Sequence, residues 1–265
     1  MRDWATGGGA KIERAKKHVE DFVRCGRAFI ETHPYSAVSQ FNPHTRHVDF
    51  VVQRTHAIAP PLACIAADAI HNLHVSLDTL WHHVWARGGT AGHKGKRTGE
   101  YFPCLETAHE LEPRFKSVKE GLEKDAVDML LKTKNNKSRD ELLGAIHSID
   151  VRDKHEIPVL AAAIYKKIIM KAPPDVVFEG RSGLQFVGEI GSGFLFLEEG
   201  TELPLAIRLE TDAGPVMHME CELTPDIAFA KGEILEGKAV VETLQEMLEL
   251  VQGIGSAFLA AGLLR

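Results

Sequence analysis

The chain has 265 residues, of which 44% are hydrophobic and 26% charged, and its formal net charge at pH 7 is −6. The length allows a large core, and the acidic balance disfavours broad, non-specific nucleic-acid binding, which needs a basic face. No apolar run approaches the ~20 residues of a membrane span, and the first residues carry no apolar signal core, so we expect a cytoplasmic protein without a membrane segment. The four cysteines are scattered and form no CxxC pair, which disfavours a zinc knuckle.

The first part of the chain is predicted to be mainly helical, over 10–170, with one hairpin over 35–57. Apolar residues recur at helical spacing over 10–32, and an alternating pattern over 46–57 predicts the second strand of the hairpin. Pro60 and Pro61 favour a helix start, and the spacing that follows predicts a helix over 61–87. Further helices are predicted at 106–119, 123–133, 139–148 and 153–170, with a break around Asp150.

The second part of the chain has a β character. Apolar stretches punctuated by Gly, Pro and Asp predict an antiparallel meander of about four or five strands over 175–231. Residues 237–262 return to a helical pattern. The hairpin could join the later sheet and the last helix could close the bundle. We therefore predict a single α+β unit over 1–265, a helical bundle with a mainly antiparallel sheet in its C-terminal half and a closing C-terminal helix.

One face of the predicted helix 61–87 carries most of the chemistry. Asp68, His71, Asp78 and His82 fall within roughly 80° of each other around the helix axis, beside an apolar stripe. Spacings of three and four residues would let each carboxylate hold an imidazole in one tautomer, as in metal sites and general bases. A second set lies near the predicted break at 150: His147, Asp150, Asp153 and His155. We expect the two segments to converge on one composite site.

Three interpretations of this face stay open. In the first, His71, Asp78, His82, Asp153 and His155 ligate zinc, iron, nickel or manganese, although the spacing is neither HExxH nor the ExxH of di-iron bundles. In the second, the same imidazoles and acids carry out acid–base or anion chemistry without a metal. In the third, the face is a charged helix surface of a non-enzymatic interaction protein, with a partner protein in place of a substrate.

Basic residues in two segments are candidate anion contacts. Arg152 and Lys154 lie near a predicted helix start, where a phosphate is favourably bound. Lys94 and Arg97 lie in a glycine-rich loop over 88–101. That loop lacks the GxxxxGK[ST] order of a nucleotide-binding loop, so we expect at most phosphate contacts from it.

Residues 66–81 (AADAIHNLHVSLDTLW) resemble the helix motif of a bacterial family without a settled activity, D-x-hydrophobic-H-N-L-R-S-A-L-D-H-hydrophobic-x-W. Phe102-Pro103 and Asp153-Lys154-His155 match two later elements of that family in order, so that the resemblance spans about 65–160. The helix motif is in turn similar to the signature of HEPN domains. These are helical bundles, many of them metal-independent RNases, with an Arg followed four to six residues later by His.

The HEPN resemblance implies an RNA-directed protein with weak or lost RNase activity and no cofactor, and a homodimer formed through the bundle. His74 stands where the family has Arg, and Thr79 stands where it has His. The resemblance then implies that His74 contacts phosphate beside a binding residue, Asn72. It also implies that His71 or His82 transfers protons on the ribose 2′-hydroxyl, with Asp68 and Asp78 orienting the imidazoles.

Overall fold

The computed structural model divides the chain into two compact units. The helical unit comprises Met1–Val23, Pro61–Pro158 and Val240–Arg265, and the sheet unit comprises Arg24–Pro60 and Val159–Ala239. The structure describes residues 4–42, 44, 47–87, 101–107, 109–111, 124–134, 136–153, 156, 158, 160–171, 177–178, 181–182, 185–197, 202–208, 220–222 and 225–264. That the two units form the single unit expected over 1–265 stays a prediction.

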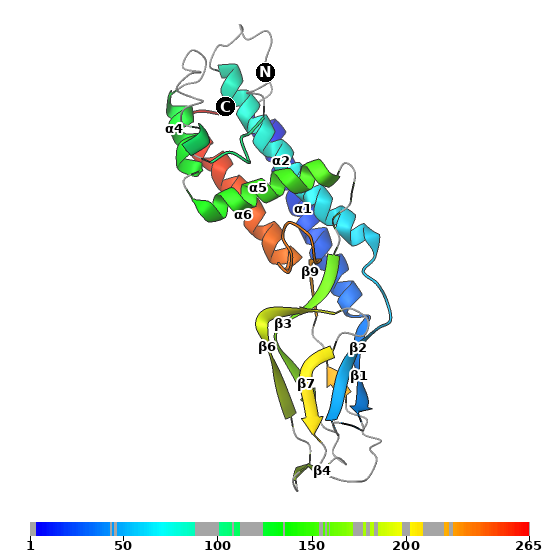
Figure 1. The fold of residues 1–265 in the computed structure, drawn as a ribbon. Helices are drawn as coiled ribbons and strands as arrows, with labels where there is room; N and C mark the ends of the chain where they lie inside the picture. The colour runs from blue at the N-terminus through cyan, green and yellow to red at the C-terminus, as the bar shows by residue number, and fades with distance from the viewer. Residues whose placement is uncertain are drawn as a thin grey trace. The chain divides into compact units, whose positions relative to one another are not determined.

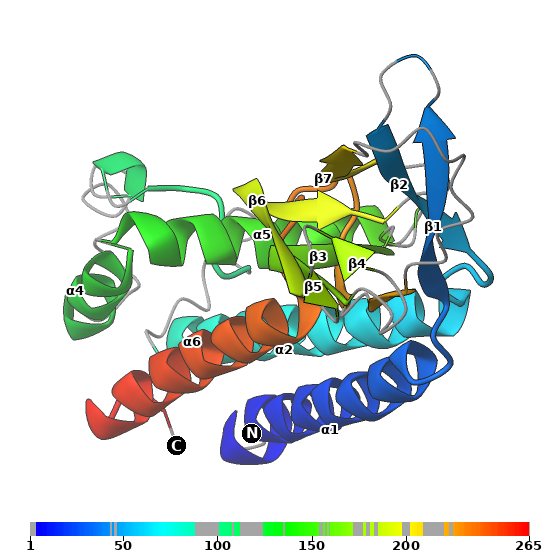
Figure 2. The same cartoon turned by 90° about the horizontal axis from the view of Figure 1, so that it is seen from below.

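Long helices build the helical unit. Their bounds are α1 (Trp4–Ile30, of which the end from Arg24 belongs to the sheet unit), α2 (Pro60–Arg87), α4 (Lys124–Thr133), α5 (Lys137–Asp153) and α6 (Val240–Ala260). The first part of α1, α2 and α6 run alongside one another, and α5 crosses α2 (Figures 1 and 2). Leu73, Leu77 and Leu80 of α2 are buried, as the apolar stripe predicted. None of the described helices is long and apolar enough to cross a membrane.

Small residues bring α1 and α2 close together. Ala15 of α1 and Ala66 and Ala69 of α2 are fully buried, and the Ser76 hydroxyl donates to the Gly8 carbonyl at 3.0 Å. A Cβ atom placed on Gly7 would lie 3.5 Å from the Thr79 methyl group. This close approach fixes the side of α2 that faces α1, and so leaves another side of α2 to face α5.

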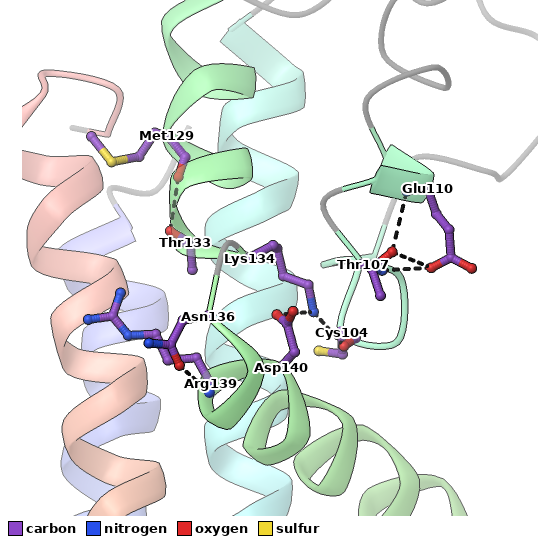
Figure 3. A network of polar contacts seen from close by, with 9 residues as sticks. All are labelled: Cys104, Thr107, Glu110, Met129, Thr133, Lys134, Asn136, Arg139 and Asp140. Atoms are coloured by element: carbon purple, nitrogen blue, oxygen red, sulfur yellow. Dashed lines mark hydrogen bonds and ion pairs between the residues drawn. The ribbon is translucent and has the colours of Figure 1, made fainter.

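Within the helical unit, a buried lysine connects residues 101–107 to α5. The Lys134 side chain is 0% exposed, and its Nζ atom lies 3.1 Å from Asp140 Oδ1 and donates to the Cys104 carbonyl at 2.8 Å (Figure 3). Asn136 caps the start of α5, because its Oδ1 accepts the Arg139 N–H at 3.1 Å. Lys134 thus connects three parts of the unit: the end of α4, the first turn of α5 and residues 101–107.

Two predicted elements in this region need correction. The helix predicted to end at 148 continues through Asp150 to Asp153, because Ile146 and Ile149 keep its apolar face buried and Asp150 is itself buried. The helix predicted over 153–170 is wrong: residues 160–171 form strand β3 (Leu160–Lys171). Its alanines and lysines favour a helix locally, but backbone pairing with other strands overrides that preference. Residues 109–111 are helical, and the rest of the predicted helix 106–119 is largely outside the described residues.

The described strands of the sheet unit pair antiparallel. One sheet has the order β1 (Tyr35–Asn42), β2 (His47–Arg54) and β7 (Glu202–Arg208), and a second has β6 (Gln185–Phe196), β3 and β8 (Glu220–Glu222), with β9 (Asp226–Phe229) also on β3. Short strands β4 (Val177–Phe178) and β5 (Arg181–Ser182) pair with each other. The register of the hairpin places Val38 opposite Val51.

This sheet arrangement confirms the α+β class and the hairpin, and it confirms that the hairpin joins a later strand, since β2 pairs with β7. The continuous meander over 175–231 is wrong, because β3 lies between β6 and β8 and the strands divide among separate sheets. The separate strands predicted near 184 and 194 are one strand, β6. The C-terminal helix predicted over 237–262 is α6.

Candidate acid–base site

Two pairs of residues, each spaced by three, face each other where α5 crosses α2. His71 and His74 lie on one face of α2, and His147 and Asp150 lie on one face of α5. Asp150 Oδ1 lies 2.6 Å from His71 Nδ1, and Asp150 Oδ2 lies 2.7 Å from His74 Nδ1. We call the set His71, Asp150, His74 and His147 the histidine relay.

The fourth member of the relay contacts the third. His147 Nδ1 lies 3.1 Å from His74 Nε2, and the two rings meet edge to face with centroids 5.0 Å apart. Asp150 is buried at 4% exposure and His74 is also buried, whereas the His71 side chain is 45% exposed. The relay therefore begins at a solvent-facing imidazole and runs through a buried carboxylate and a buried imidazole.

The carboxylate at the centre of the relay stays ionised over the physiological range. Burial is the largest single effect on Asp150 and opposes its charge. The hydrogen bonds from His74 and His71 and the charge of those imidazoles together outweigh burial and hold the pKa of Asp150 below its usual value. An ionised carboxylate only accepts hydrogen bonds, so both Nδ1 atoms donate to it.

His147 is biased towards its neutral form. Burial, and next the neighbouring charge of His74, lower the pKa of His147, although Asp78, Asp150 and Glu106 act in the opposite direction. His147 is therefore neutral near pH 7, which suits a proton acceptor.

The lowered pKa of His147 makes stability depend on pH. Below about pH 6.5, where an unperturbed histidine titrates, the unfolded chain binds a proton that folded His147 resists. The free energy of unfolding should therefore fall as the pH falls through that range, down to the folded pKa of His147. Urea unfolding of the wild type and of His147→Gln at several pH values measures this, and equal pH slopes for the two proteins would contradict it.

Asp78 lies near the relay without joining it. Its Oδ1 accepts the Phe102 N–H at 3.0 Å, which ties residues 101–107 to α2. Burial, as the largest effect, raises the pKa of Asp78, and the charge of Asp150 adds to that, while His74 and His147 lower it. Asp78 is thus an electrostatic neighbour of the relay and an anchor for Phe102.

The remaining predicted residues of α2 have other surroundings. His82 is exposed and meets His83 edge-on, with ring centroids 6.3 Å apart. Asn72 is buried and its amide donates to the Asp68 carbonyl at 2.7 Å. Asp150, from another helix, takes the place beside His71 that the sequence suggested for Asp68. Both ring nitrogens of His74 are engaged, which leaves neither for a direct phosphate contact.

The predicted contacts on and after α5 are only partly described. Arg152 follows Asp150 by two residues, which places it about 200° away around the helix. Burial, and next the charges of Asp150 and Asp68, raise the pKa of Asp153. Lys154, His155, Lys94 and Arg97 lie outside the described residues. Within the described parts of the chain, no group of three or more His, Cys, Asp or Glu side chains is placed to hold a metal ion.

The side chains that meet where α5 crosses α2 differ from the set predicted from sequence. The structure brings His71 together with Asp150 and His147, which were expected to converge on α2, and it adds His74 as their link. The sequence suggested His147 and Asp150 only as members of a second set that would meet the α2 residues. Their own spacing of three, repeated on α2, was the signal that they present one face. Comparison with protein-family models, curated proteins and solved structures finds no match to this chain.

Proposed function

We propose that this protein is an RNA-directed, HEPN-like bundle with weak metal-independent RNase activity, acting as a homodimer, and that His71 is its proton-transfer residue. The observation that carries the proposal is the buried carboxylate of Asp150, which receives His71 Nδ1 at 2.6 Å while the imidazole reaches solvent. A carboxylate in this position orients the imidazole and stabilises the imidazolium, as general acid–base catalysis requires.

The chemistry follows from the free end of His71. With Nδ1–H donated to Asp150, Nε2 is the atom that exchanges a proton with substrate. In RNA cleavage a base or solvent water takes the proton of the 2′-hydroxyl, the 2′-oxygen bonds to phosphorus, and the bond from phosphorus to the 5′-oxygen breaks. Protonated His71 Nε2 would give its proton to that leaving oxygen, and the neutral imidazole would remain bonded to Asp150. The products are a 2′,3′-cyclic phosphate and a 5′-hydroxyl.

The departures from the HEPN motif explain why we propose a weak activity. His74 stands where that motif has Arg, and its two nitrogens are taken by Asp150 and His147. Thr79, where the motif has His, donates to the Val75 carbonyl of its own helix at 2.7 Å. A guanidinium that neutralises phosphate is therefore missing from the motif, and His71 takes the proton-transfer role.

Two matched histidine variants on α2 test the proposal. Wild-type protein should cleave RNA in EDTA, and His71→Ala should lower the rate about 10²–10⁴-fold, the usual contribution of a general acid or base. His82→Ala removes an exposed imidazole of the same helix outside the relay and should leave the rate unchanged. Product ends are read by mass spectrometry, and circular dichroism confirms that both variants fold.

Three results would overturn this function. One is wild-type protein that does not cleave RNA in EDTA, and another is an equal loss in the two variants. The third is stoichiometric zinc, iron, nickel or manganese in the purified protein, removed by EDTA together with the activity, which would favour the metal alternative. RNA or protein binding without cleavage would favour a non-enzymatic interaction protein.

A further inference from the structure

We propose that His147 is a second proton-transfer residue, linked to His71 through Asp150 and His74, so that one hydrogen-bonded chain ends in two basic imidazole nitrogens. The inference rests on the proposed function for its substrate, a phosphodiester with an attacking hydroxyl. The hydrogen-bonded chain itself can be measured without any substrate.

The direction of each hydrogen bond fixes the tautomers along the relay. Ionised Asp150 accepts from Nδ1 of His71 and of His74, so a neutral His74 has its lone pair on Nε2. That lone pair faces His147 Nδ1 at 3.1 Å, and His147 must donate there. Neutral His147 is then left with a lone pair on its own Nε2, as a base requires.

The buried carboxylate also stabilises a proton taken up at His147. When Nε2 of His147 accepts a proton, its Nδ1 proton can pass to Nε2 of His74. His74 then carries the positive charge, in direct contact with Asp150 at 2.7 Å. No proton is lost in this step, and the charge moves from the periphery of the relay to its ionised centre.

The two ends of the relay have different surroundings, which assigns different roles to them. His147 lies among groups from three segments: His74 and Asp78 of α2, Asp150 of α5 and Glu106 of residues 101–107. Burial is the largest effect there and favours neutral His147, the base that receives the proton of the 2′-hydroxyl. His71 Nδ1 contacts Asp150 directly, and in this proposal His71 has the role of the acid that protonates the leaving oxygen.

Nitrogen-15 spectra of the imidazoles test the relay on the full chain at about pH 8, where unperturbed histidines are neutral. In wild-type protein, His71, His74 and His147 should all show a protonated Nδ1 and an unprotonated Nε2. In His74→Phe, which removes the acceptor but keeps a ring, His147 should shift to the Nε2–H form that an unrestrained histidine side chain prefers. The control His82→Phe should leave the His147 signals in place.

The wild-type spectrum decides the inference even where His74→Phe does not fold, because an Nε2–H tautomer at His147 would overturn it. Where RNA is cleaved, the rate should follow a bell-shaped pH profile, and His147→Gln should remove its acidic limb with little change in KM. Tautomers as expected in a protein that does not cleave RNA would refute the proposed function and leave the relay intact. RNA cleavage by a protein whose His147 has the Nε2–H tautomer would support the proposed function and refute the relay.

Discussion

Replacing Asp150 with leucine is expected to lower the free energy of unfolding by about 3 kcal/mol, because two hydrogen bonds to a charged group are lost and a buried imidazole keeps an unpaired N–H. The carboxylate is 4% exposed and contacts His71 and His74 at 2.6 and 2.7 Å. Asp150→Asn should cost less, since its amide oxygen still accepts one hydrogen bond. Its NH₂ group, however, forces one imidazole into the other tautomer.

Urea unfolding at neutral pH measures the effect of Asp150, with Asp153→Asn as the control on the same helix. Asp153 is only partly buried and its raised pKa reports unfavourable surroundings for its charge, so its variant should be neutral or slightly stabilising. Asp150 contributes stability above its unfolded pKa of about 3.9, and that contribution is lost as the pH falls through its lower folded value. A difference below about 0.5 kcal/mol at neutral pH would contradict the relay as a structural element.

Lys134→Met is expected to destabilise the protein by about 3 kcal/mol, near the lower end for breaking a buried ion pair. The Lys134 side chain is 0% exposed, and its removal leaves Asp140 and the Cys104 carbonyl without their cation. Asp140 is 22% exposed, so water compensates for part of the loss. A second change, Asp140→Leu on the Lys134→Met background, should recover part of the stability, because the uncompensated carboxylate is gone while the Cys104 carbonyl stays unpaired.

The neighbouring pair of Lys137 and Glu141 is a matched control. Both side chains are largely exposed, and their charged atoms lie 3.8 Å apart at a spacing of four residues on α5. Lys137→Met should therefore change stability by no more than about 0.5 kcal/mol. Chemical unfolding followed by tryptophan fluorescence compares the variants. Equal changes in the free energy of unfolding at 134 and 137 would show that burial of Lys134 does not strengthen its ion pair.

Elements with a strong local signal were predictable from the sequence, and those decided by distant partners were not. The prolines at 60 and 61 and the apolar stripe predicted α2 within one residue of its bounds. Strand β3 was predicted as a helix because its alanines and lysines suit a helix, and only β6, β8 and β9 supply the alternative pairing. Lys134 belongs to a polar, lysine-rich stretch, and nothing in that stretch indicates that this one ammonium group is enclosed.

The candidate site shows the same division. The chemistry-bearing face of α2 followed from spacing, and its convergence with the segment around 150 was an expectation that spacing alone does not decide. The partner of His71 did not follow from the sequence. Spacing shows that an acid three residues away on α2 could reach His71, but it does not show whether an acid on another helix takes that place. The expected break at Asp150 also concealed the relay, since a capping aspartate would use its carboxylate on backbone N–H groups.

The close packing of α1 against α2 limits the size of the side chain that position 79 can hold. Thr79 is the position where the resembling HEPN motif carries its histidine, and its methyl group faces the backbone of Gly7 with room for little more than one carbon atom. The Ser76 hydroxyl, one turn earlier, is bonded to the Gly8 carbonyl. A side chain at 79 as large as an imidazole would meet the Gly7 backbone, so replacing Thr79 with histidine is expected to loosen the packing of α1 against α2. The side of α2 that faces α5, which carries His71 and His74, is not limited by this contact.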